Sequence, residues 1–123
     1  MAGAGGDRSG IRRHRRWMEM YAEDAVHEFP FAAVGAVKRL EGKDEIRAYV
    51  AGMGDRVQFG SLDDVQVREW GDEVLIEAEG HHFAAATGEP FDLRYLWIIT
   101  SREGRVTRLR DYMGPRRPSA HEQ

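Results

Sequence analysis

Residues 105–113 read Arg-Val-Thr-Arg-Leu-Arg-Asp-Tyr-Met, and this run decides how the rest of the chain is interpreted. Side chains alternate between the two faces of a β-strand. One face of such a strand carries the apolar side chains together with one acid: Thr107, Leu109, Asp111 and Met113. The other face carries two arginines. Burying a carboxylate among apolar side chains is costly unless it is paired, protonated or used. Asp111 is therefore the first candidate for a catalytic acid or base.

Three more segments upstream of this run are predicted to be strands, because turn residues separate them. They span residues 57–70, 73–85 and 91–101. The turns are Gly71-Asp72, Thr87-Gly88-Glu89-Pro90 and Arg102-Glu103-Gly104. Glycine, aspartate and proline at these positions are typical of hairpin connections. The second half of the chain is therefore predicted to be an antiparallel meander.

The strand over residues 73–83 alternates between small or apolar residues and charged ones. We assign its smaller face to a cavity: Val74, Ile76, Ala78, Gly80 and His82. Glu77, Glu79 and His81 fall on the opposite face. Adjacent histidines on a strand point in opposite directions, so His81 and His82 do not predict a shared metal site.

The strand over residues 93–99 is apolar on both faces, which predicts that both faces are buried. We assign Leu96 and Ile98 to the cavity, together with Leu109 and Met113. The opposite face has no further helix to cover it. It is predicted to meet a second copy of the chain, as a homodimer through the outer sheet face.

The first half of the chain is predicted to contribute two helices. Trp17, Tyr21 and Ala25 recur at helical spacing within residues 11–25, and Gly52 and Gly54 are expected to end a second helix over residues 42–53. A short extended piece over residues 26–29 and a strand over 36–40 lie between them. Aromatic and sulfur side chains of this half are predicted to pack the core or to line the pocket: Trp17, Tyr21, Phe29, Phe31, Tyr49 and Met53. Helices followed by antiparallel strands predict an α+β domain, in which a curved sheet wraps around the helices and leaves a concave, mostly apolar pocket.

Composition narrows the function further. The chain has 123 residues, which suits a single domain over residues 11–115, with disordered ends over 1–10 and 116–123. The net charge of −3 argues against a nucleic-acid-binding protein, and the basic run over residues 12–16 is interpreted as a solvated helix start. The chain contains no cysteine and no apolar run long enough for a membrane span. We expect a cytoplasmic protein that uses no metal and no other cofactor.

The order and spacing of several short segments resemble one known family. They are Tyr21-Ala22-Glu23-Asp24-Ala25-Val26, Phe29-Pro30-Phe31, Glu41-Gly42-Lys43-Asp44-Glu45-Ile46, Gly104-Arg105-Val106 and Arg110-Asp111-Tyr112. Over roughly residues 17–115 the chain is similar to the SnoaL-like branch of the nuclear transport factor two-like superfamily. The resemblance implies a conical α+β barrel with a deep apolar pocket, usually dimeric through the outer sheet face. It also implies a full helix ahead of Trp17, so either the chain begins late or the pocket is open on one side.

Two enzyme groups of this superfamily have catalytic residues that this chain mostly lacks. Ketosteroid isomerases place aspartates at the positions of Phe29 and Leu96, so the resemblance does not imply steroid isomerisation by that apparatus. Limonene-epoxide hydrolases share Asp111, but their arginine and second aspartate match Ala78 and Gly80.

Polyketide cyclases of the SnoaL type offer the nearest chemical parallel. They use an aspartate of the late sheet with a histidine nearby, which Asp111 with His27 or His82 could imitate. We therefore expect cofactor-free acid–base chemistry by Asp111 and His27 on a hydrophobic, oxygenated small molecule: cyclisation, isomerisation, dehydration or hydrolysis. The alternative is a non-catalytic module of the same fold that binds a small ligand or serves assembly.

Overall fold

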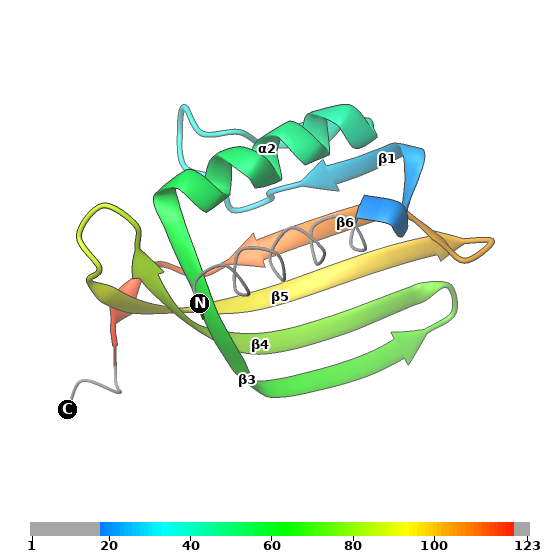
Figure 1. The fold of residues 1–123 in the computed structure, drawn as a ribbon. Coiled ribbons are helices and arrows are strands. Elements are labelled where there is room, and N and C mark those ends of the chain that lie inside the picture. Colours follow the sequence, from blue (N-terminus) through cyan, green and yellow to red (C-terminus); the bar gives the residue numbers. More distant parts are fainter. Residues whose placement is uncertain (1–17, 120–123) are drawn as a thin grey trace, which may run out of the picture.

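A computed structural model describes residues 18–119 of the chain as one curved sheet crossed by one helix (Figure 1). The elements, in chain order, are β1 (Tyr21–Glu28), β2 (Arg39–Glu41), α2 (Lys43–Arg56), β3 (Val57–Trp70), β4 (Glu73–Ala84), β5 (Pro90–Arg102), β6 (Arg105–Met113) and β7 (Arg117–Pro118). The α+β prediction is confirmed, and so is the curvature of the sheet.

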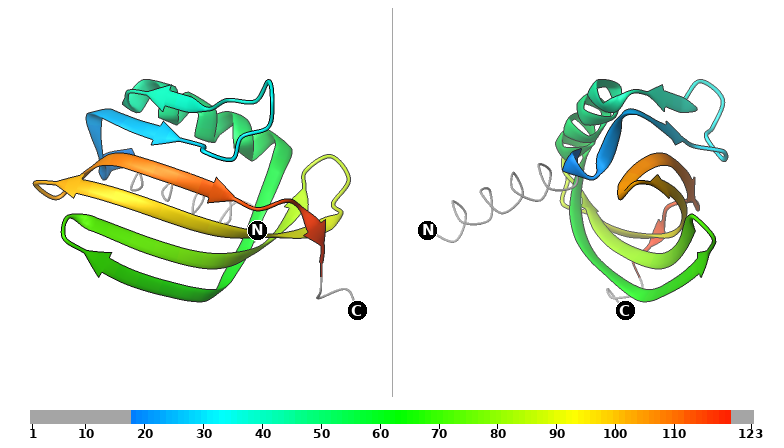
Figure 2. Two further views of the ribbon diagram at one scale, coloured as in Figure 1. Left: turned by 180° about the vertical axis from the view of Figure 1, so that it is seen from behind. Right: turned by 90° about the vertical axis from the view of Figure 1, so that its right-hand side faces the viewer.

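The strands lie in the order β2-β1-β6-β5-β4-β3, and β7 pairs with the start of β5. All neighbours are antiparallel except β1 and β6, which run parallel. Figure 2 shows that the sheet curls strongly and that α2 lies against the edge formed by β1 and β2. This curl leaves a concave face toward the helix and a convex face away from it.

The four predicted strands of the second half are confirmed, nearly at their predicted bounds. The turn between β5 and β6 shows why the sequence predicted the ends of these strands well. Arg102 pairs with Arg105, and both intervening residues, Glu103 and Gly104, have positive φ angles of 54° and 78°. A two-residue hairpin with this backbone matches the right-handed twist of its strands, and glycine makes it accessible.

Helix α2 buries Ile46 completely against β1 and β6. Tyr49 and Val50 pack on the same core cluster, as their spacing predicts. The prediction that Gly52 and Gly54 end this helix is wrong, because α2 continues to Arg56. A glycine costs a helix only about 1 kcal/mol, so packing and the Val57 N–H bond to the Met53 carbonyl carry the helix past both glycines.

The predicted helix over residues 11–25 is wrong in its last part, because Tyr21 begins strand β1. The buried residues of β1 are Tyr21, Ala25 and His27, and the buried Phe29 follows the strand directly. The pairing of β1 with β6 shifts register between Tyr21 and Val26. Because of this irregularity, the first two buried residues of the strand, Tyr21 and Ala25, are four residues apart instead of two. A four-residue spacing of buried residues is also what an α-helix produces.

The C-terminal prediction also needs correction. Arg117 pairs with Asp92 and Pro118 with Phe91, so residues 117–118 form β7 rather than part of a disordered tail. The predicted N-terminal segment over 1–10, the first part of the predicted helix over 11–17 with Trp17, and residues 120–123 lie outside the described residues.

Cross-strand partners settle which side chains share the concave face. Asp111 is opposite Trp97, and Ala78 is opposite Tyr95. The concave residues of β5 are therefore Leu93, Tyr95, Trp97 and Ile99. The prediction that Leu96 and Ile98 line the pocket is wrong, because their partners on β6, Tyr112 and Arg110, lie on the convex face. A strand apolar on both sides gives the sequence no means of choosing between its faces.

The convex face is charged over much of β4. Glu79 pairs with Arg94 directly across the sheet, and Arg117 binds the same carboxylate. The prediction that Glu77 and Glu79 face away from the pocket is confirmed. Within residues 18–119, no helix is long and apolar enough to cross a membrane.

Replacing Gly60 with alanine should destabilise the protein by about 3 kcal/mol or more, which is the scale of a severe steric defect. An added Cβ would lie 2.0 Å from the backbone oxygen of His81, where β3 bulges against β4. The matched control is Gly52→Ala, whose Cβ meets no described atom within 4 Å and which should stabilise α2 by up to about 1 kcal/mol. Urea unfolding of both variants measures the difference. Equal stability of the two would contradict the close approach of β3 to β4.

Candidate active site

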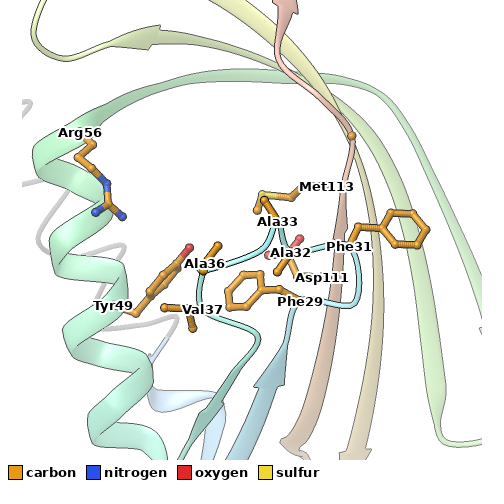
Figure 3. Close-up of a pocket in the computed structure, with 12 residues that line it drawn as sticks. Phe29, Phe31, Ala32, Ala33, Ala36, Val37, Tyr49, Arg56, Asp111 and Met113 are labelled. Atoms are coloured by element: carbon orange, nitrogen blue, oxygen red, sulfur yellow. The ribbon is translucent and has the colours of Figure 1, made fainter.

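A cavity of about 460 Å³ opens between α2, the end of β6 and the loop that follows β1 (Figure 3). Its inner wall includes Phe29, Tyr49, Asp111 and Met113. The loop between β1 and β2 supplies a mostly small-residue wall: Ala32, Ala33, Gly35, Ala36 and Val37. Phe31 at the mouth is 73% exposed, so the cavity opens to solvent on this side. Its size falls within the range typical of small-molecule sites.

Asp111 lies at the inner end of this cavity and is 9% exposed. His27, on the neighbouring strand β1, is 4% exposed, and its Nε2 lies 3.2 Å from Asp111 Oδ2. The parallel pairing places His27 beside Leu109, from where its ring reaches the acid two residues further along β6. An ionised carboxylate only accepts hydrogen bonds, so Nε2 is the donor when Asp111 is charged.

Two polar atoms of this pair lack a hydrogen-bond partner among the described residues. They are His27 Nδ1 and Asp111 Oδ1, and both are buried. The His27 ring stacks on Phe29 with a centroid distance of 4.5 Å and an interplanar angle of 21°. Leaving buried polar atoms unpaired costs free energy, and such atoms concentrate at functional sites. The His27 ring is therefore held in place by stacking, while one polar atom of each residue remains available for a hydrogen bond to a ligand.

Tyrosine side chains form much of the surroundings of Asp111. Burial raises the pKa values of the Tyr21, Tyr49 and Tyr95 hydroxyls, and the negative charge of Asp111 raises them further. All three hydroxyls therefore stay protonated at neutral pH. They can donate hydrogen bonds, but they do not supply a competing base.

A second, smaller cavity of about 180 Å³ shares Met113 and Gly114 with the first. His82 and Tyr95 line it from β4 and β5, and His82 Nε2 lies 2.8 Å from the Tyr95 hydroxyl. Met53 lies on its helix side, and Arg116 lies at its outer side. Both cavities thus border the end of β6.

The predicted histidine orientations are confirmed. His82 lies on the concave face and His81 on the convex face, where its ring bonds Asp92 at 2.8 Å and Asp63 at 2.9 Å. These bonds raise the pKa of His81, that to Asp92 most strongly. No group of three or more His, Asp or Glu side chains within residues 18–119 is arranged to hold a metal ion.

The other residues predicted for the pocket fall into three groups. Phe29, Phe31, Tyr49 and Met113 line the larger cavity, while Met53, His82 and Met113 line the smaller. Tyr21 and Leu109 are core residues behind the pocket wall, and Ala78 is fully buried. Gly80 leaves no free space, because an added Cβ would lie 2.5 Å from His82 Nε2 and 2.7 Å from the Tyr95 ring.

The sequence did not reveal several residues of the two cavities. Arg56 faces the larger cavity from the end of α2, across from Asp111 (Figure 3). The predicted helix stopped short of Arg56, so its position was hidden. Tyr95 was placed on the wrong face together with the rest of β5. Its alternation with Leu93 and Trp97 was the one available signal, and it became decisive only when the pairing with β6 was known.

Comparison with known proteins agrees with this architecture. Residues 11–109 match the SnoaL-like domain. The chain belongs to the SnoaL-like domain family. Structures of this family and of the wider nuclear transport factor two-like superfamily share the curved sheet described above.

Two curated relatives extend over most of this SnoaL-like chain. The uncharacterized protein YesE of Bacillus subtilis is 35% identical over 105 residues, which cover 82% of this chain and 70% of YesE. An uncharacterized PhzA/B-like protein of Pseudomonas aeruginosa is 30% identical over 105 residues, which cover 84% of this chain and 74% of that protein.

Solved structures give the same result at the level of the fold. A crystal structure of a candidate isomerase from Bacillus subtilis superposes with a TM-score of 0.77 at 34% identity and covers 83% of this chain and 75% of that one. A candidate polyketide cyclase from Xanthomonas campestris gives a TM-score of 0.69 at 22% identity, with coverage of 80% and 76%. At that identity the second likeness concerns the fold alone.

The environment of His82 predicts a pH dependence of stability. Burial lowers the pKa of His82 below its ordinary value of 6.5, so the unfolded chain binds a proton at a higher pH than the folded protein does. The contribution of His82 to stability is complete above pH 6.5 and is lost as the pH falls from there through the folded pKa. The free energy of urea unfolding of the natural protein should therefore fall more steeply below pH 6.5 than that of His82→Gln. His81 titrates in both proteins and cancels, so parallel profiles would contradict a buried neutral His82.

Proposed function

We propose that the protein is a cofactor-free acid–base enzyme that acts on a hydrophobic small molecule carrying a carbonyl or related oxygen. The observation that carries this proposal is the buried pair of Asp111 and His27 at the inner end of a mostly apolar cavity. An acid and a histidine within hydrogen-bond reach are the elements of proton transfer. The similar Bacillus subtilis protein, described as a candidate isomerase, supports the same class of chemistry.

In the proposed mechanism, Asp111 takes a proton from a carbon next to a substrate carbonyl. The electrons of the C–H bond move toward the carbonyl oxygen and form an enolate, while the carboxylate becomes a carboxylic acid. The carboxylic acid first exchanges its proton with water and then returns a proton to the substrate at the same carbon, at a second carbon or at the oxygen, which restores the carboxylate. His27 orients the acid through its bond to Oδ2, which stabilises the carboxylate before the first step and after the second.

Arg56 and Tyr49 give the cavity a polar side opposite the acid. Figure 3 shows both projecting from α2, while Asp111 and Phe29 lie across the cavity. The Phe29 and Tyr49 rings are tilted by 46° with their centroids 5.2 Å apart, which gives the cavity an aromatic wall for a flat ligand. The arrangement suits a ring system with oxygen atoms at its edges.

Substituting Asp111 by asparagine keeps the shape of the side chain and removes the proton transfer. A general test uses 2-tetralone, a flat bicyclic ketone, in deuterated water, with deuterium uptake at the carbon next to the carbonyl followed by mass spectrometry. The natural protein should accelerate this uptake, and Asp111→Asn should reduce the acceleration by about 100-fold or more. The matched control is Asp44→Asn on the exposed first turn of α2, which should retain full activity.

Unchanged exchange in Asp111→Asn would rule out the role of this acid. A second function, ligand binding without catalysis, is favoured by the open mouth of the cavity, where Val37 is 44% exposed and Phe31 more so. Saturable binding of the ketone with no exchange above the buffer rate would support that function instead.

We also propose that the protein forms a homodimer through the convex face of the sheet. Leu75, Leu96 and Ile98 form an apolar band there, and they are only half-buried within one chain. Leu96→Glu should therefore split the dimer, because it places a carboxylate in the apolar interface opposite Glu77 and Tyr112, where no cation lies directly across the sheet. Sedimentation velocity at micromolar concentration measures the change, with Val34→Glu on the fully exposed loop after β1 as the control. A natural protein that sediments as a monomer would contradict the dimer.

A further inference from the structure

The smaller cavity contains a hydrogen-bond relay that the acid–base proposal does not use. It runs from the backbone of Gly60 on β3, through the ring of His82 on β4, to the hydroxyl of Tyr95 on β5. Three neighbouring strands thus supply one atom group each. The two side chains of the relay are buried, since His82 is 3% exposed and Tyr95 is 8% exposed.

The direction of this relay follows from its first member. The Gly60 N–H can only donate, and it donates to His82 Nδ1 at 3.1 Å. Nδ1 therefore carries no hydrogen. In neutral imidazole the hydrogen is then on Nε2, which must donate to the Tyr95 oxygen at 2.8 Å. The lowered pKa of His82, caused mainly by burial, agrees with a neutral ring.

Tyr95 is left with its own hydrogen to donate. Its oxygen already accepts from His82 Nε2, and within residues 18–119 the hydroxyl has no other hydrogen-bond partner. The Tyr95 ring is held in place by Trp97, stacked at 4.6 Å and 20°, so the hydroxyl cannot swing away freely. A fixed O–H group that faces a cavity is a ready donor to a ligand oxygen.

The mouth of the same cavity carries a positive charge. Arg116 lies over the Phe91 ring with its guanidinium carbon 4.2 Å from the ring centroid. Its charge lowers the pKa of both His82 and Tyr95, although burial raises that of Tyr95 overall. A negatively charged or strongly polar oxygen is therefore favoured here, and the remaining walls are mostly apolar.

We propose that the Tyr95 hydroxyl, oriented by His82 and assisted by Arg116, binds a carbonyl or carboxylate oxygen of an otherwise apolar ring ligand. This deepens the proposed function and rests on it in one respect, namely that one ligand spans both cavities. Met113 and Gly114 line both, and Met113 pairs directly with Tyr95 across the sheet. An oxygen held at Tyr95 would place the adjoining carbon toward Asp111.

Binding of 2-naphthoate, measured by isothermal titration calorimetry, tests the inference without requiring turnover. Tyr95→Phe removes the hydroxyl and keeps the ring, and it should weaken binding about tenfold, as expected for the loss of one hydrogen bond to a charged group. The matched control is Tyr112→Phe on the convex face of β6, which should bind like the natural protein. Arg116→Gln should weaken 2-naphthoate but leave the neutral 2-naphthamide unaffected.

Equal affinity of Tyr95→Phe and the natural protein would overturn the inference, and so would failure of the natural protein to bind 2-naphthoate at millimolar concentration. A loss of affinity caused by Tyr49→Phe instead would place the carboxylate in the larger cavity and would also overturn the inference.

Because Tyr95→Phe leaves a buried donor unpaired, the folding of this variant is checked by circular dichroism. Nitrogen-15 NMR of the natural protein provides an independent test, since a hydrogen on His82 Nδ1 contradicts the relay. Deuterium exchange by Asp111 is a separate readout, so failure of the acid and failure of the donor can be distinguished.

Discussion

The hydrogen bond between His27 and Asp111 is the constraint on which the site depends. A carboxylate this deeply buried needs a partner, and the partner lies 84 residues earlier in the chain. Only the parallel pairing of β1 with β6 brings the two together. On the solvent side of the same strands, Glu28 binds Arg108 at 2.7 Å and Arg39 at 3.0 Å, which ties β2, β1 and β6 in one register. Exposed ion pairs contribute little stability singly, but here they join three strands at the level of the site.

Register is the second requirement, because a slip of one residue turns every side chain of a strand to the other face. Asp111, Tyr95 and His82 come from three strands and share the concave face only in the observed pairing. The bulge of β3 near Gly60 belongs to the same arrangement, since it brings a backbone N–H to His82. The polar groups of both cavities are thus supported by the sheet itself, which holds them more rigidly than a loop would.

The loop between β1 and β2 differs from the sheet, because it is not part of the rigid scaffold. It forms the outer wall of the larger cavity with small side chains, and most of its residues are exposed. A wall of this kind can change without disturbing the core cluster around Ile46. Residues that select a ligand commonly lie on loops of this type, while the groups that act on it stay on the scaffold. The division fits a family in which one fold hosts different reactions.

Local pattern was sufficient to determine the four strands of the second half, helix α2, the orientation of His81 and His82, and Asp111 as the acid of the concave face. Each of these depends on neighbours a few residues away, such as alternation, helical spacing or the Glu103-Gly104 turn. The start of β1, the inward face of β5, the role of Arg56 and the relay through Tyr95 depended instead on tertiary structure. A bulge in β1 imitated a helix, and β5 is apolar on both faces, so only pairing with β6 could choose between them. The sequence by itself therefore determined which acid the concave face of β6 carries, and the tertiary structure decided which groups surround it, because contacts between distant strands leave no periodic signal along the chain.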